Sequence, residues 1–125
     1  MNALAVALGG AVGSLLRYAV SLWMVRSHPA GWPWATLLVN VLGSALLGGL
    51  AFHTIEQGAL SQPTRLFLMV GLCGGFTTMS TFAFETLEYV RMGFAGKAAT
   101  YAILSVALSV AAVFAGGGVA RWLAN

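Results

Sequence analysis

Gly71-Leu-Cys-Gly-Gly-Phe-Thr-Thr-Met-Ser-Thr-Phe-Ala-Phe-Glu85 lies within an otherwise apolar segment that runs from about Arg65 to Tyr89. Two adjacent glycines are followed, after one phenylalanine, by a stretch rich in threonine and serine. This pattern favours a broken helix over the alternative, a kinked helix with simple glycine packing. Non-helical backbone at membrane depth is tolerated only where it is buried in protein or lines a cavity. Freed carbonyl groups there can coordinate a cation, and freed N–H groups can meet an anion.

Three other segments are long and apolar enough to cross a bilayer, whose core of about 30 Å needs roughly 20 helical residues. The chain has 125 residues, of which 59% are hydrophobic and 7% charged, whereas a soluble domain carries about 25% charged residues. We therefore predict an all-α, multi-pass membrane protein with a single four-helix transmembrane domain over residues 1–125. The other three spans are expected at about Ala3–Val25, Trp34–Ile55 and Ala98–Leu123, with short links at 26–33, 56–64 and 91–97.

The charged residues are few and scattered. The net charge is +3, and the charged residues form no cluster suited to a phosphate backbone, so we expect no nucleic-acid partner.

With four spans, both termini lie on one side of the membrane, and the positive charges of the two faces nearly balance. Either the positive-inside rule fails for this chain, or the protein inserts both ways and pairs antiparallel. One face carries Arg65 and Arg121 besides the amino terminus, and the other carries Arg26, Arg91 and Lys97.

Two of the predicted helices carry a polar residue at every fourth position, which places these residues on one helix face. The pattern fits interhelical hydrogen bonds, worth about 0.6 kcal/mol each on average, and hydroxyls can also bond back to their own helix. It fits equally well a row of polar side chains that faces water or an ion. The residues are Thr36, Asn40 and Ser44 in the second helix and Tyr101, Ser105 and Ser109 in the fourth.

Two charged residues lie inside predicted spans, Arg17 in the first and Glu85 in the third. Ionisable groups at this depth are costly and need a reason. The two could pair, each could extend to an interface, or the arginine could raise the local anion concentration in a vestibule.

The sequence contains no catalytic constellation, so an enzyme is disfavoured. Transport is favoured, with a non-transporting membrane scaffold or assembly subunit as the alternative.

Three ordered motifs resemble those of the Fluc fluoride channels, also called CrcB proteins. The first is Gly9-Gly10-Ala-Val-Gly13-Ser-Leu-Leu-Arg17-Tyr18, and the second is Trp34-Ala-Thr36-Leu-Leu-Val-Asn40-Val-Leu-Gly43-Ser. The third is Gly74-Gly75-Phe-Thr77-Thr78-Met-Ser80-Thr81-Phe82. The resemblance covers the whole chain. It implies an antiparallel, dual-topology homodimer with two fluoride pores, which exports fluoride passively across the cell inner membrane.

The resemblance also implies roles for particular residues. A structural sodium ion at the dimer centre would be held by the backbone carbonyls of Gly74 and Thr77. The pore would be lined by Asn40 as a donor, by Phe82 through its ring edge, and by Met79, Ser80, Thr81, Tyr101, Ser105 and Ser109. Met79 departs from the family pattern, which has a second phenylalanine at this position, and a thioether offers no comparable ring edge.

A small drug/proton antiporter is another short, four-helical, dual-topology class of membrane protein. Such transporters need an acidic residue within the first helix in order to trade protons for cationic drugs. This chain has Arg17 there and no acidic residue in that helix. The sequence therefore argues against this class.

Overall fold

The computed structural model describes residues 1–28 and 31–125, and every regular element in these ranges is helical. The first long helix is α1 (Asn2–Ser27). The second is α2 (Trp34–Ala51), continued by a π-helical turn, η1 (Phe52–Glu56). The third consists of α3 (Gln62–Arg65), the π-helical η2 (Leu66–Cys73), α4 (Gly74–Phe76) and α5 (Met79–Arg91), and the fourth is α6 (Ala95–Ala124).

Four helical segments have the length and apolarity of membrane spans: Asn2–Ser27, Trp34–Glu56, Gln62–Arg91 and Ala95–Ala124. The predicted four-span, all-α fold is confirmed, and each predicted end lies within three residues of the observed one. The protein is thus a multi-pass membrane protein. Of the predicted first link, Pro29 and Ala30 lie outside the described residues.

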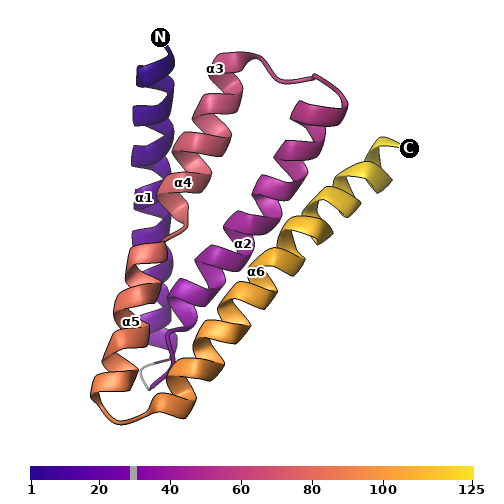
Figure 1. Cartoon of the computed structure of the whole chain (residues 1–125). Coiled ribbons are helices and arrows are strands. Elements are labelled where there is room, and N and C mark those ends of the chain that lie inside the picture. Colours follow the sequence, from indigo (N-terminus) through magenta and orange to yellow (C-terminus); the bar gives the residue numbers. More distant parts are fainter. Residues whose placement is uncertain (29–30) are drawn as a thin grey trace.

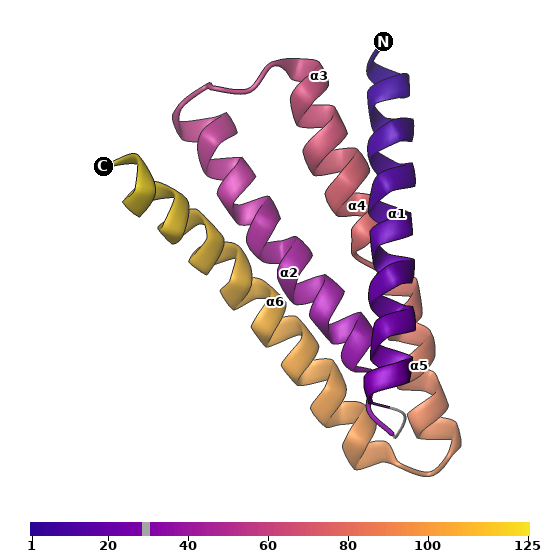
Figure 2. The same cartoon turned by 180° about the vertical axis from the view of Figure 1, so that it is seen from behind.

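The helices form two pairs that diverge toward the end of the molecule that carries both termini (Figures 1 and 2). In one pair α1 packs along η2 and α4, and in the other α2 packs along α6. The pairs meet at the opposite end, where a short turn joins α5 to α6 (Figure 1). Between the two pairs lies a cavity that is lined by Asn40 and Ser44 of the predicted α2 stripe.

Glycines allow both pairs to pack with their backbones in contact. A Cβ atom at Gly13 would overlap the carbonyl oxygen of Leu72, and one at Gly116 would overlap the carbonyl oxygen of Ala45. Small residues that permit such approach are the usual device for helix association in lipid, where no hydrophobic force drives helices together. These glycines therefore hold one subunit together.

The third span is broken at Thr77 and Thr78, as predicted. Thr77 has φ −80° and ψ 161°, and Thr78 has φ −152° and ψ 113°, so both are extended. The break follows the glycine pair by two residues, because Gly74 and Gly75 still belong to α4. The prediction of a broken rather than a kinked helix is thus confirmed, and the break places two consecutive non-helical residues inside a membrane span.

The substitution Gly116→Ala tests the α2–α6 contact. We expect it to lower the thermal unfolding midpoint in detergent, because the added methyl group meets backbone that cannot move cheaply, at a cost of about 1–3 kcal/mol. Gly118→Ala is the matched control on the same helix, since nothing lies within 4 Å of the added Cβ there. It should leave the midpoint unchanged or raise it, as alanine favours helix by about 1 kcal/mol over glycine. Equal effects of the two substitutions would contradict the packing described.

Candidate functional site

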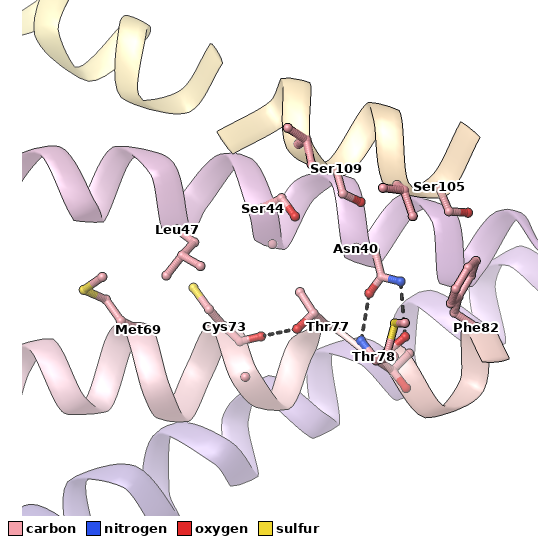
Figure 3. A pocket seen from close by; sticks show the side chains of 15 residues that line it. Asn40, Ser44, Leu47, Met69, Cys73, Thr77, Thr78, Phe82, Ser105 and Ser109 are labelled. Carbon is pink, nitrogen blue, oxygen red and sulfur yellow. Dashed lines mark hydrogen bonds between the residues drawn. The ribbon is translucent and has the colours of Figure 1, made fainter. Parts of the chain in front are cut away.

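The side chain of Asn40 on α2 satisfies both backbone polar groups of Thr78 in the break. Its Oδ1 accepts a hydrogen bond from the Thr78 N–H at 2.8 Å, and its Nδ2 donates to the Thr78 carbonyl at 3.2 Å (Figure 3). A backbone group left without a partner at this depth costs several kcal/mol. One amide side chain therefore makes the extended conformation of Thr78 tolerable.

Thr78 in turn begins the second half of the broken helix. Its hydroxyl accepts a hydrogen bond from the Thr81 N–H at 3.2 Å and donates to the Thr81 hydroxyl at 2.9 Å. The Ser80 hydroxyl lies 3.4 Å from the same atom. A threonine in this position caps the free N–H groups of a helix start. Asn40 and Thr78 together fix where α5 begins and how its first turn is oriented.

These two interactions also release two backbone carbonyls from their helical partners. In an unbroken helix the carbonyl of residue i accepts from the N–H four residues later. The Gly74 carbonyl would therefore accept from the Thr78 N–H, but this N–H donates to Asn40 instead. Likewise, the Thr77 carbonyl would accept from the Thr81 N–H, which donates to the Thr78 hydroxyl. Gly74 and Thr77 are the residues whose carbonyls were predicted as cation ligands. The side chains of the described residues contain no group of three His, Cys, Asp or Glu that could hold a metal ion instead.

A cavity of about 390 Å³ lies beside the break, between α2, the third span and α6. Its lining includes seven of the predicted site residues: Asn40, Gly74, Thr77, Met79, Phe82, Ser105 and Ser109. Figure 3 shows the labelled polar side chains along it, with the Asn40–Thr78 hydrogen bonds between Thr77 on one side and Phe82 and Ser105 on the other. Ser44 also lines the cavity, so two of the three polar residues predicted on one face of α2 (Thr36, Asn40 and Ser44) border the same space. The lining contains no lysine or arginine.

Ser105 is the polar residue of this lining with the least solvent contact. It is only 4% exposed, and its hydroxyl makes no hydrogen bond of good geometry in the part of the chain that the structure describes, although the Tyr101 hydroxyl lies nearby. Buried hydroxyls are normally paired, and an unpaired one calls for an explanation.

Phe82, in the same lining, is buried, with its ring centroid 5.3 Å from that of Tyr101. Met79 is 72% exposed.

A second cavity, of about 260 Å³, lies on the other side of Thr78. Thr78 lines both cavities, so this one residue borders the two spaces. Hydroxyl-bearing side chains and one arginine dominate the second cavity: Ser14, Arg17, Tyr18, Ser21, Thr36 and Thr81. Of the predicted pore residues, Thr81 thus lies here and not in the first cavity, and Ser80 lines neither.

Glu85 is held by two hydroxyl groups from other helices. The Thr36 hydroxyl donates to its Oε1 at 2.8 Å, and the Tyr101 hydroxyl donates to its Oε2 at 2.7 Å. Tyr101 is fully buried and belongs to this network, not to the lining of the first cavity. No ion pair joins Arg17 to Glu85 in residues 1–28 and 31–125, so the alternative in which these two charges pair is not realised.

Sequence reasoning missed the central role of Thr78, although the residue was part of the quoted motif. A threonine placed directly before a new helical segment is a common N-cap, and this signal could have identified it. Its bond to Asn40 carried no such signal, because 38 residues separate the two.

The family model described as "CrcB-like protein, Camphor Resistance (CrcB)" matches residues 4–117. The chain belongs to the CrcB-like family. A Thermus thermophilus protein named "Fluoride-specific ion channel FluC" is 51% identical to this CrcB-like chain over 113 residues, which are 90% of this chain and 88% of the relative. Relatives of the same name from Hyphomonas neptunium and Roseiflexus sp. are 48% and 42% identical, and the match covers 94% and 98% of this chain and 94% and 99% of theirs.

The role of the Thr78 hydroxyl is tested by Thr78→Val, which keeps the shape of the side chain and removes the cap. We expect the thermal unfolding midpoint of the CrcB-like protein in detergent to fall, by the equivalent of about 0.5–2 kcal/mol. Thr78→Ser, which keeps the hydroxyl, should stay close to the original protein. If Thr78→Val is as stable as the original protein while Thr78→Ser loses stability, the methyl contact and not the cap is what matters.

Proposed function

We propose that this CrcB-like chain forms a fluoride-selective ion channel, through which fluoride leaves the cell passively across the inner membrane. The names of its relatives support fluoride as the ion. The observation that carries the proposal is the buried hydroxyl of Ser105, which makes no hydrogen bond among the described residues and lies beside a cavity whose lining includes further hydroxyl and amide groups. An anion that passes through the cavity would supply the partner this hydroxyl lacks.

The chemistry of the lining suits fluoride. The ion is small and holds its hydration shell tightly, so a pore must replace that shell with close hydrogen-bond donors. Hydroxyl and amide groups can do so, and the positive edge of an aromatic ring such as Phe82 can add to them. A fixed positive charge at the same place could hold the ion too strongly to release it. The absence of lysine and arginine from the lining is consistent with rapid passage.

The two cavities that meet at Thr78 suggest the route. Fluoride would collect near Arg17, because a positive charge at a vestibule raises the local anion concentration. It would then pass the first turn of α5, where Ser80 and Thr81 present hydroxyls, and enter the cavity lined by Asn40, Ser105 and Ser109. Tyr101 would contribute to the polar track through its hydroxyl, beside Glu85. Met79 would stand beside the pore without the ring edge of phenylalanine.

The complete channel would be an antiparallel homodimer with two pores. Asn40, Ser44 and Ser109 line a cavity on one side of the subunit (Figure 3), and polar groups of this kind do not face lipid. A second, inverted copy would cover them. The nearly balanced charges of the two loop faces are compatible with insertion in both orientations.

A sodium ion would join the two copies where their broken helices cross. The carbonyls of Gly74 and Thr77, released from their helical partners, fit a hard cation that prefers oxygen ligands. Nothing lies within 4 Å of the position that a Cβ of Gly74 would take, so an inverted copy could bring its own carbonyls close. The ion would then supply a fixed cross-link at the centre of the dimer.

The proposal is tested by fluoride efflux from liposomes that hold the purified protein, with chloride-loaded liposomes alongside. Fast fluoride release with little chloride release is the expected result. Release of neither ion by folded protein in sodium buffer would refute the channel and favour a non-transporting membrane scaffold. Comparable release of both ions would refute the selectivity.

Ser105→Ala tests the contribution of the unpartnered hydroxyl to conduction. A hydrogen bond to a charged group is worth about 1.5–3 kcal/mol, so we expect fluoride efflux to slow by roughly tenfold or more, with the unfolding midpoint unchanged. Thr100→Ala is the matched control, since Thr100 is an exposed hydroxyl residue of the same helix. Unchanged efflux in Ser105→Ala would remove the hydroxyl from the pathway.

The sodium proposal predicts a higher thermal unfolding midpoint in sodium than in potassium at equal ionic strength. Binding to the folded state alone stabilises it in proportion to ligand occupancy, so the midpoint should rise with sodium concentration and level off. Identical midpoints in the two salts would contradict a structural sodium ion.

A further inference from the structure

A separate cavity of about 350 Å³ lies where α5 ends, α6 begins and residues 31–33 lead into α2. Figure 1 shows these three segments together at the end of the molecule opposite the termini. One membrane span ends with α5, and the next begins with the first turn of α6. The cavity between these two ends therefore lies at the level where the bilayer meets water. It is away from the cavity beside the break, and it has a different lining.

Opposite charges stand on different elements around this cavity. Glu88 on α5 has its only ion pair among the described residues with Arg91, at 3.4 Å, and the two side chains are 40% and 70% exposed. Such pairs contribute little. Lys97 on α6 lies over the Phe94 ring, 4.7 Å from its centroid, and no carboxylate within residues 1–28 and 31–125 pairs with it. Glu85, which also lines the cavity, accepts only neutral hydroxyl donors.

Aromatic residues form the walls between these charges. Trp32 and Tyr89 lie with ring centroids 6.3 Å apart, and the Tyr89 hydroxyl holds the neighbouring backbone by donating to the Gly31 carbonyl at 2.5 Å. Aromatic faces attract ammonium groups, most strongly where water is excluded. Phe84 and Phe94 complete the rim and are 60% and 47% exposed, which offers apolar surface next to the charged part of the cavity.

We propose that this cavity binds the headgroup of a zwitterionic aminophospholipid. The ammonium group would lie among the aromatic faces with Glu85 and Glu88, and the phosphate would pair with Lys97. The glycerol and acyl chains would run along the exposed Phe84 and Phe94 into the bilayer. This occupant is favoured because it matches both charges, the aromatic walls and the level in the membrane. The inference does not depend on the proposed function.

Lipid binding to the delipidated full-length protein in detergent tests the assignment, by native mass spectrometry or by the shift of the thermal unfolding midpoint. The probes are dioleoyl-phosphatidylethanolamine, dioleoyl-phosphatidylglycerol, which lacks the ammonium, and free phosphoethanolamine, which lacks the acyl chains. We expect phosphatidylethanolamine to bind at least fivefold more tightly than phosphatidylglycerol, and free phosphoethanolamine to bind far more weakly than either. Equal affinity for the two lipids would overturn the proposal, and so would tight binding of free phosphoethanolamine, which would indicate a water-soluble organic ammonium as the ligand.

Three substitutions localise the binding. Glu88→Gln should weaken phosphatidylethanolamine binding by roughly tenfold and reduce the preference over phosphatidylglycerol, whereas Lys97→Gln should weaken the binding of both lipids by roughly tenfold, because both carry the phosphate. Arg26→Gln is the matched control, because Arg26 is an exposed charge in the last turn of α1 that does not line the cavity and joins no ion pair within residues 1–28 and 31–125. If Arg26→Gln weakens binding as much as Lys97→Gln, or if neither cavity variant has an effect, the lipid binds elsewhere. Both variants are surface charge changes, so their folding can be checked by the unfolding midpoint without lipid.

Discussion

The two hydrogen bonds between the Asn40 side chain and the backbone of Thr78 are the interaction on which the rest of the site depends. A membrane span can be interrupted only if its freed backbone groups find partners inside the protein. Asn40 offers one donor and one acceptor in a single plane, which matches the N–H and carbonyl of one extended residue. With Thr78 fixed, its hydroxyl caps α5, and the carbonyls of Gly74 and Thr77 lose their helical partners.

The glycine contacts hold together the two helix pairs that this interaction links. Gly13 against Leu72 and Gly116 against Ala45 bring each helix pair to backbone contact, while the two pairs diverge from one another. The cavity beside the break lies between them, and four polar residues of α2 and α6 stand along its largely apolar wall: Asn40, Ser44, Ser105 and Ser109. Charged side chains are kept to its margins, with Arg17 in the neighbouring cavity and Glu85 bound by hydroxyls. This separation is suited to an ion that must be attracted at the entrance and released along the path.

Much of the fold was predictable because hydropathy and glycine patterns are local properties of the sequence. The four spans, the broken third helix and the polar faces of the second and fourth helices all follow from residues close together in the chain. The site was predictable only in part. The pattern identified Asn40 but not its partner, and it could not separate Thr81 from Ser105, which line different cavities. Likewise, spacing alone placed Tyr101 in a stripe with Ser105, whereas the structure commits its hydroxyl to Glu85. Such assignments depend on contacts between distant segments, which a single sequence does not reveal.

Amide hydrogen exchange at Thr78, measured together with fluoride efflux on the same preparation of the Asn40→Leu variant, tests the central claim most directly. The account predicts that the Thr78 amide, protected in the original protein, exchanges much faster in the variant and that fluoride efflux is lost with it. Asn40→Asp, which keeps the acceptor for this amide, should retain more of the protection. A Thr78 amide that remains equally protected in Asn40→Leu would contradict the account, because the break would then be held by something other than Asn40.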